Sequence, residues 1–169
     1  NMDMPENLIP YLHRGNPLGL PTWLSRFDFV LDTQGRLRMV EINADTPCFL
    51  IESYYANEVG ARYFDKEHPN EGARDELERF LKRVYERTSQ ENSKYNTANS
   101  GGPNPFVFAC FHDYLEDLGT TKFLMNTMKS ACPEADVRFL SFYDMVIDDE
   151  GILLPDGSHA SNLYRLLPM

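Results

Sequence analysis

The sequence predicts an α/β fold, and two observations support this prediction. A continuous apolar run at 105–111 is followed by a helical segment at 116–132 and a second apolar strand at 136–142. A strand, a helix and a strand at this spacing form a β-α-β unit, and such units build parallel sheets. Two further strands, at 26–32 and 37–43, flank a short turn and predict an antiparallel hairpin. The 169 residues suffice for one domain with a proper core, or for a domain plus an extra segment.

The first 64 residues predict an irregular start, the hairpin and one helix. Residues 1–22 are rich in proline and glycine and predict irregular structure. Gln34-Gly35 supplies the positive φ that a tight hairpin turn needs. A helix is expected over 46–64, because Thr46 suits the N-cap and Pro47 suits the first helical position.

The clearest helix signal covers residues 72–90. Its apolar residues recur at the spacing of one helix face, and charged residues cover the rest: Leu77, Phe80, Leu81 and Val84. Residues 91–104 are polar and rich in Gly and Asn, and predict a loop. Pro133 ends the helix at 116–132. Turns are expected at "DDEG" and "PDG", and the chain then stops at the apolar "RLLPM", as though cut in mid-fold.

Composition excludes several classes of protein. The net charge of −10 argues against a nucleic-acid partner, which would require a basic surface. No stretch approaches the roughly 18 apolar residues of a membrane helix, and no signal peptide is recognisable, so a cytoplasmic protein is expected. Three cysteines without metal-type spacing fit a reducing compartment, with Cys110 and Cys132 as small core residues. The scattered histidines make a zinc site improbable.

The hairpin brings four polar side chains together if its register is as expected. A loop of two or four residues places Asp32 opposite Leu37, and further along the ladder Asp28 lies opposite Glu41. Arg26 then lies opposite Asn43. Residues that lie opposite each other share a face of the sheet, so a guanidinium, two carboxylates and an amide converge. A three-residue loop would slip the register by one and break this cluster.

The chemistry of this cluster favours a magnesium site. Two carboxylates that face each other repel unless a positive charge lies between them. Asp28, Glu41 and Asn43 offer only oxygen ligands, which suit Mg²⁺ rather than zinc. Arg26 would then hold a phosphate oxygen of ATP. A simpler interpretation is a solvent-exposed face with a salt bridge from Arg26 to Asp28 or Glu41, and spacing alone leaves both open.

The amino-acid sequence of the hairpin resembles that of a known enzyme family. "RFD" followed by "EIN" resembles the metal-binding strand pair of ATP-grasp ligases. The longer "RFDFVLDTQGRLRMVEINADTP", followed by "ESYYANEVG", is similar to the glutathionylspermidine synthase family. "PFVFACFHDYLEDLGTTKFLM" and "DGSHASNLYRLLPM" also resemble segments of that family. The resemblance covers roughly residues 20–60 and 105–169, as counted from these strings.

The resemblance implies a carboxylate–amine ligase with a circularly permuted ATP-grasp fold. ATP would phosphorylate a carboxylate, an amine would attack the acyl phosphate, and an amide would form. Residues 1–60 would contribute the metal-binding hairpin and following helix, and residues 61–169 a Rossmann-like pre-ATP-grasp domain with a parallel sheet and flanking helices. By carry-over, Asp28, Glu41 and Asn43 are expected to bind Mg²⁺, and Arg26 is expected to contact the transferring phosphate.

The same resemblance suggests residues for the two substrates, a peptide-like acid and an amine such as a polyamine. Thr46 and Cys48 fall where the family has small hydroxyl residues near the acid, and Cys48 departs from that pattern. Cys48 is also interpreted as a small residue packed inward rather than a nucleophile. Glu116 and Asp117 would meet a cationic amine. Alternatively, Asp117 with Thr120 begins a helix, where acidic residues are favoured.

The family's ATP-binding lysines and phosphate-covering loop are not recognisable in residues 1–169. We therefore expect the chain to need a further ATP-grasp portion of the same polypeptide and to be inactive alone. One alternative is a non-catalytic α/β module that binds a ligand or partner and descends from such a ligase. A plain nucleotide-binding regulatory domain is the third possibility, although the G-x-G-x-x-G fingerprint is absent.

Overall fold

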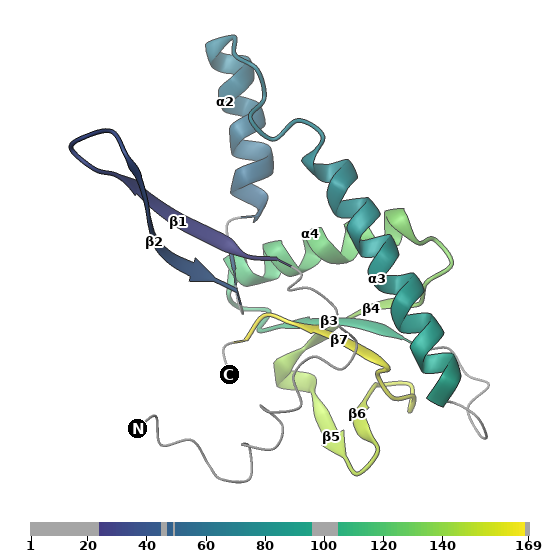
Figure 1. Cartoon of the computed structure of the whole chain (residues 1–169). Helices are drawn as coiled ribbons and strands as arrows, with labels where there is room; N and C mark the ends of the chain where they lie inside the picture. Colours follow the sequence, from purple (N-terminus) through teal and green to yellow (C-terminus); the bar gives the residue numbers. More distant parts are fainter. Residues whose placement is uncertain (1–23, 45–46, 49, 96–104, 168–169) are drawn as a thin grey trace, which may run out of the picture.

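The computed structural model describes residues 24–44, 47–48, 50–95 and 105–167. It confirms the predicted α/β class: a parallel sheet lies at the centre, with helices on one side and two small antiparallel hairpins at its periphery (Figure 1). In the described ranges, no helix is both long and apolar enough to cross a membrane.

The first hairpin pairs β1, Arg26–Leu31, with β2, Leu37–Asn43, in antiparallel fashion. It projects from the body of the molecule and does not join the central sheet (Figure 1). The two predicted strands are therefore confirmed.

The helix expected over 46–64 begins later than predicted. Pro47 and Cys48 are not helical, Thr46 lies outside the described residues, and helical structure is described from residue 50. Its second turn, Glu52–Ala56, is a π-helix, and α2 continues as Asn57–Phe64. Asp65 ends α2 in the left-handed conformation, with φ at 51°.

The next helix, α3, is longer than the predicted range. It runs over Ala73–Tyr95, so residues 91–95, expected in a loop, are helical. Glu and Lys in this stretch are good helix formers, and the first glycine after it is Gly101. Leu81 and Val84 of its predicted stripe are buried, and Leu77 and Phe80 pack against them.

The predicted β-α-β unit forms the centre of the molecule. It consists of β3, Phe106–Cys110, then α4, Leu115–Ala131, then β4, Val137–Ser141. The strands β3 and β4 are parallel, as expected. A third parallel strand, β7 at Asn162–Arg165, pairs with the other edge of β3 and gives the order β4-β3-β7. The sequence alone indicates only an apolar segment there.

Between β4 and β7 the chain forms a second hairpin where only turns were predicted. It joins β5, Val146–Asp148, to β6, Gly151–Leu153, and His159 adds a bridge to Leu153. An ion-pair network holds the following loop to β4: Arg138 contacts Asp136 and Asp156.

Two apolar clusters, one on each side of β3, form the core. Phe106 and Phe108 pack with the buried faces of α3 and α4. Val107 and Ala109, which point the other way along the strand, pack with Leu140 and Leu154 and with residues of the β5–β6 region. Successive side chains of one strand therefore serve two layers. Cys110 and Cys132 are fully buried, as predicted.

Candidate functional site

The hairpin register agrees with the prediction at the polar end and differs at the turn. Arg26 lies opposite Asn43 and Asp28 opposite Glu41, as expected. Nearer the turn, Leu31 lies opposite Leu37, so the expected pairing of Asp32 with Leu37 is wrong. The two stretches differ by one position, and the irregularity lies between Asp28 and Phe29.

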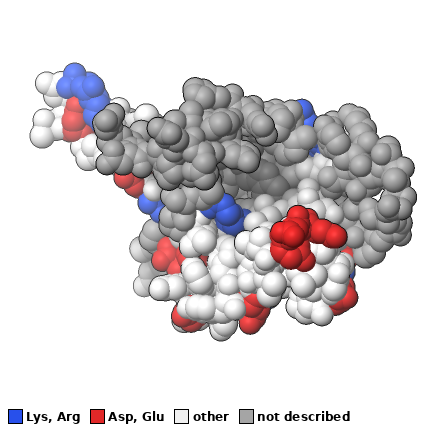
Figure 2. All heavy atoms as spheres, turned by 90° about the horizontal axis from the view of Figure 1, so that it is seen from below, with Lys and Arg blue, Asp and Glu red and all other residues white. Residues whose placement is uncertain are grey.

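The turn explains the slip, because its loop has three residues. Asp32 N donates to Arg36 O at 3.0 Å, and Gly35 N donates to Asp32 O at 2.9 Å. Gly35 has a φ of 72°, which confirms the predicted positive-φ position. The Asp32 carboxylate accepts from Gln34 N at 2.9 Å and Arg36 Nε at 2.8 Å. Figure 2 shows basic and acidic side chains together at this tip, where Arg36 and Arg38 pair with Asp32.

A β-bulge restores the predicted register before the polar cluster. Phe29 lies opposite Met39 and Asp28 opposite Glu41, so Val40 is an extra residue on β2. The three-residue loop that was expected to break the cluster therefore leaves it intact, because the bulge compensates for the slip.

The four predicted side chains form one hydrogen-bonded group. Arg26 Nε and Nη2 donate to Asp28 Oδ1 and Oδ2 at 2.9 and 3.1 Å. Asn43 Nδ2 donates to Glu41 Oε1 at 2.7 Å and to Asp28 Oδ2 at 3.3 Å. Arg26 Nη2 also lies 3.7 Å from Glu41 Oε1. The side chains of Asp28 and Glu41 are 36% and 55% exposed, so a ligand from solvent can reach both.

The electrostatics keep this face ionised. The hydrogen bonds from Arg26, more than any other cause, lower the pKa of Asp28 below its usual value. The pKa of Arg26 is raised, chiefly by its hydrogen bonds to Asp28. Both groups are therefore charged at neutral pH.

The donor set of this face fits a hard divalent cation. Asn43 Nδ2 lies between the two carboxylates and contacts both, at the position where a shared cation would neutralise them. Rotation of the amide by half a turn would present its oxygen to the same point, giving three oxygen ligands. Within the described residues, no group of three or more His, Cys, Asp and Glu side chains is arranged to hold a metal. The candidate set has two carboxylates, so water and phosphate oxygens would complete the shell.

Two of the predicted substrate residues lie in direct contact. Cys48 Sγ donates to Asp117 Oδ1 at 3.3 Å, although the two residues are far apart in the sequence. Burial raises the pKa of the Cys48 thiol to about 12, and the carboxylates of Asp117 and Glu116 contribute to the rise. The thiol is therefore protonated at neutral pH, in agreement with the interpretation that it is not a nucleophile. The pKa of Arg26 is raised chiefly by its hydrogen bond to Asp28, and Cys48, when ionised, adds the smallest contribution, so Cys48 and the hairpin group lie within electrostatic range of each other. Thr46 lies outside the described residues.

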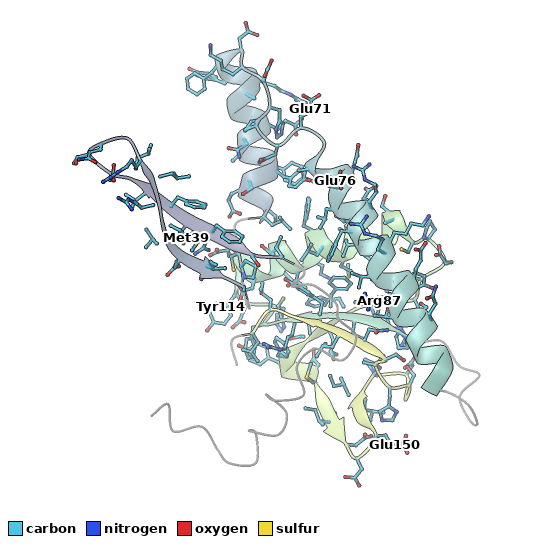
Figure 3. All side chains as sticks on the ribbon, in the orientation of Figure 1. Met39, Glu71, Glu76, Arg87, Tyr114 and Glu150 are labelled. Atoms are coloured by element: carbon cyan, nitrogen blue, oxygen red, sulfur yellow. The ribbon has the colours of Figure 1, made fainter. Side chains whose placement is uncertain are left out.

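The start of α4 differs from the prediction. The helix begins at Leu115 with Tyr114 as N-cap, so Asp117 does not cap it. Glu116 and Asp117 lie in the first turn, where the helix dipole favours acidic side chains. The hydroxyl of Thr120 is buried and has no hydrogen-bond partner among the described residues, so it does not complete a capping box. Figure 3 shows Tyr114 on the side of the sheet from which the hairpin projects.

Tyr164 of β7 is a member of this region that the sequence did not reveal. Burial raises the pKa of its hydroxyl above the usual value, and Cys48, Asp117 and Cys110 add to the shift. Cys110 ends β3 and Tyr164 lies near the end of β7. The candidate site therefore lies near the carboxyl ends of two parallel strands, where ligands bind in open α/β sheets. The only signal was the aromatic residue in "NLYRLL", and that segment had not been predicted as a strand.

A second polar group lies at the same edge, formed by the loop after β3, the last residue of β4 and the turn that follows it. His112 Nδ1 lies 2.7 Å from Ser141 Oγ, and Tyr143 donates its hydroxyl to Asp113 at 2.8 Å. Ser141 Oγ also accepts from Tyr143 N at 3.3 Å. These hydrogen bonds connect the loop after β3 to the end of β4 and the turn that follows it.

Residues 1–169 match the family described as glutathionylspermidine synthase preATP-grasp. This chain belongs to that family. The glutathionylspermidine synthase resemblance of the hairpin is thereby confirmed, and the parallel sheet with its hairpin and helices agrees with a pre-ATP-grasp α/β domain. Membership supports an origin related to ligases.

Proposed function

We propose that this chain provides the magnesium, phosphate and substrate contacts of an ATP-dependent carboxylate–amine ligase of the glutathionylspermidine synthase type. The observation that carries the proposal is the interlocked group of Arg26, Asp28, Glu41 and Asn43 on one exposed face of the hairpin. A face that only needed solubility would not require two carboxylates to converge on one donor atom.

The hairpin residues have separate roles in this proposal. Asp28, Glu41 and the amide oxygen of Asn43 hold Mg²⁺. When bound, this ion neutralises phosphate charge and orients ATP, which is a substrate. Arg26 donates to an oxygen of the transferred phosphoryl group. Its present partner Asp28 is the residue that would turn to the cation, which frees the guanidinium for phosphate.

The helix α4 contributes the contacts to the amine. Glu116 and Asp117 in its first turn provide negative charge for a cationic amine, such as a polyamine. Cys48 donates a hydrogen bond to Asp117 and keeps its proton, so a neutral thiol lies next to the site of the peptide-like acid. The carboxylate of that acid takes the terminal phosphoryl group of ATP, and ADP leaves. A neutral amine nitrogen then attacks the carbonyl carbon of the acyl phosphate, the bond from this carbon to the phosphate oxygen breaks, and inorganic phosphate leaves. The nitrogen loses a proton as the amide forms. Most of the protein's contribution is positioning and charge neutralisation.

The remaining ATP-grasp portion of the polypeptide is the proposed partner of the hairpin. A two-stranded hairpin is marginally stable alone and needs further strands or a helix against it. Its second face carries apolar side chains that are about half exposed or more: Phe27, Phe29, Leu31, Leu37, Met39 and Ile42. Such a face fits intramolecular packing against another part of the ligase.

The decisive experiment measures ATP-dependent phosphate release by the full-length protein with candidate acids and amines. Glu41→Gln removes one carboxylate charge and keeps the shape of the side chain. We expect the magnesium concentration for half-maximal rate to rise by at least about tenfold. Glu71→Gln, at the exposed connection between α2 and α3 far from the hairpin (Figure 3), is the matched control.

Two outcomes would count against the ligase assignment. Unchanged magnesium dependence in Glu41→Gln would remove the metal role of the hairpin. Binding of ATP without phosphate release, for every acid and amine tried, would favour the non-catalytic module. The same assay on residues 1–169 tests whether this portion is inactive alone, as expected.

A further inference from the structure

We infer that Val40 is a positioning residue, whose insertion as a bulge in β2 aims the Glu41 carboxylate at the shared point between Asp28 and Asn43. This inference rests on the proposed function of the hairpin. It concerns how the ligand set is assembled rather than which residues belong to it.

The three-residue loop sets a register between β1 and β2 that would separate Glu41 from Asp28. From the turn as far as Phe29 and Met39, the pairing follows the three-residue loop. If this register continued, Asp28 would lie opposite Val40 and Phe27 opposite Glu41. Because opposite residues share a face, Glu41 would then lie on the apolar face and be separated from Asp28.

The bulge moves Glu41 to the other face. With Val40 as the extra residue, Asp28 lies opposite Glu41, and Arg26 lies opposite Asn43. Phe27, Phe29 and Leu31 of β1 lie together with Leu37 and Met39 of β2 on the opposite face. Phe27 and Phe29, for example, stack with ring centroids 6.4 Å apart. Because Val40 is accommodated as a bulge and not within the ladder, the polar and apolar faces of the hairpin stay separate.

Packing gives no separate reason for the insertion. The Val40 side chain is 66% exposed and belongs to neither core cluster. Bulges raise the local twist, bend the strand and redirect neighbouring side chains, and they are over-represented next to active sites. The neighbour here is Glu41, whose Oε1 lies 2.7 Å from Asn43 Nδ2 and 3.7 Å from Arg26 Nη2.

Deletion of Val40 tests the effect of the bulge on the orientation of Glu41 without changing which residues of β1 and β2 lie opposite each other. The shortened strand would pair Asp28 with Glu41 and Arg26 with Asn43 in a regular ladder, so the four groups would still share a face. Only the twist and bend of the bulge would be lost. A variant with the same ligands and the same pairing, but a straighter strand, therefore tests whether the aim of Glu41 matters.

The experiment compares ΔVal40 with Val40→Thr, which keeps the extra residue and hence the bulge. Binding of Mn²⁺ in the presence of a non-hydrolysable ATP analogue is followed through the electron paramagnetic resonance signal of free Mn²⁺, on the full-length protein. We expect ΔVal40 to weaken Mn²⁺ binding by about tenfold or more and Val40→Thr to bind as the unchanged protein does. The thermal midpoint should not fall in ΔVal40, because a regular ladder replaces the bulge and the core clusters are untouched.

Equal Mn²⁺ binding by ΔVal40 and the unchanged protein would overturn the inference. If ΔVal40 does not fold, a glycine inserted between Val40 and Glu41 displaces the carboxylate along the strand instead. Binding as tight as in the unchanged protein would then overturn the inference in the same way. Glu41→Gln, measured in parallel, distinguishes the two proposals: if it too leaves Mn²⁺ binding unchanged, the metal site itself is wrong.

Discussion

At the residue scale, Cys48 between the hairpin and α4 is a protonated, uncharged thiol. The thiol donates to Asp117, and burial with two nearby carboxylates raises its pKa to about 12. A protonated thiol is a poor nucleophile and a weak hydrogen-bond donor. Cys48 therefore contributes by packing and by its hydrogen bond to Asp117, and not as a nucleophile.

The replacement Asp117→Asn should make Cys48 more reactive. Loss of the carboxylate removes a charge that raises the pKa of the thiol, so the thiolate fraction at pH 8.5 increases. We expect alkylation of Cys48 by iodoacetamide, followed by peptide mass spectrometry, to accelerate severalfold. Asp113→Asn, whose partner is Tyr143, is the matched control. Equal alkylation rates in Asp117→Asn and the unchanged protein would refute this account of the thiol.

The residues of the hairpin group were predictable from the sequence, but the length of the turn and the bulge that bring them together were not. Alternation and pairing identify Arg26, Asp28, Glu41 and Asn43 without a structure, because opposite residues share a face. The turn length was misjudged, since "TQGR" allows several loops and Gly35 fits each of them. A bulge leaves no distinct signature in a strand that reads "RMVEI", so Val40 could not have been identified as the inserted residue.

At the element scale, an ion-pair network anchors the loop between β6 and β7 to the start of β4. Arg138 contacts Asp136 at 2.6 Å and Asp156 at 2.7 Å. Asp156 also accepts from the backbone N and the hydroxyl of Ser158. The hydrogen bonds from Ser158, followed by those from Arg138, lower the pKa of Asp156 to about 2.

This network predicts an acid-dependent contribution to stability. Asp156 has a folded-state pKa of about 2, below its usual value of 3.8, so its stabilisation is present above pH 3.8 and lost as the pH falls towards 2. In Asp156→Asn we expect a lower thermal midpoint at pH 6 and a difference from the unchanged protein that shrinks between pH 4 and about 2. Asp149→Asn, at the exposed turn between β5 and β6, is the charge-removal control. A difference that stays constant with pH would show that Asp156 acts only through its shape.

The elements that escaped prediction share a physical cause. The strands β5 and β6 contain three residues each, too few for alternation to be recognised. The edge strand β7 has four residues and gains its stability from pairing with β3, which the local sequence does not reveal. Residues 91–95 of α3 escaped prediction because their polar composition is typical of a loop, although Glu91 and Lys94 are good helix formers.

At the scale of the whole molecule, stability is unevenly distributed. The strand β3 is buried along its whole length and lies between two core clusters. The strands β1 and β2 are mostly exposed and pair only with each other in the described structure. The candidate site thus joins a loosely supported hairpin to a firmly packed sheet.

Hydrogen exchange should report this difference on residues 1–169. Backbone amides of β1 and β2 are expected to exchange at least about tenfold faster than those of β3, because local opening of the hairpin exposes little apolar surface. Mass spectrometry of peptides covering 26–43 and 106–110 measures both. In the full-length protein the hairpin should gain protection if the remaining portion of the ligase packs on its apolar face. Equal protection of the two peptides in residues 1–169 would contradict the uneven distribution.

The bulge at Val40 bears on how relatives of this hairpin should be aligned. Loop length and strand insertions can offset each other, so the count of positions from the arginine-aspartate strand to the glutamate-asparagine strand can vary while the ligands still meet. A search template with a rigid spacing between those two strings would overlook such sequences. Templates that allow a one-residue gap ahead of the glutamate would find them.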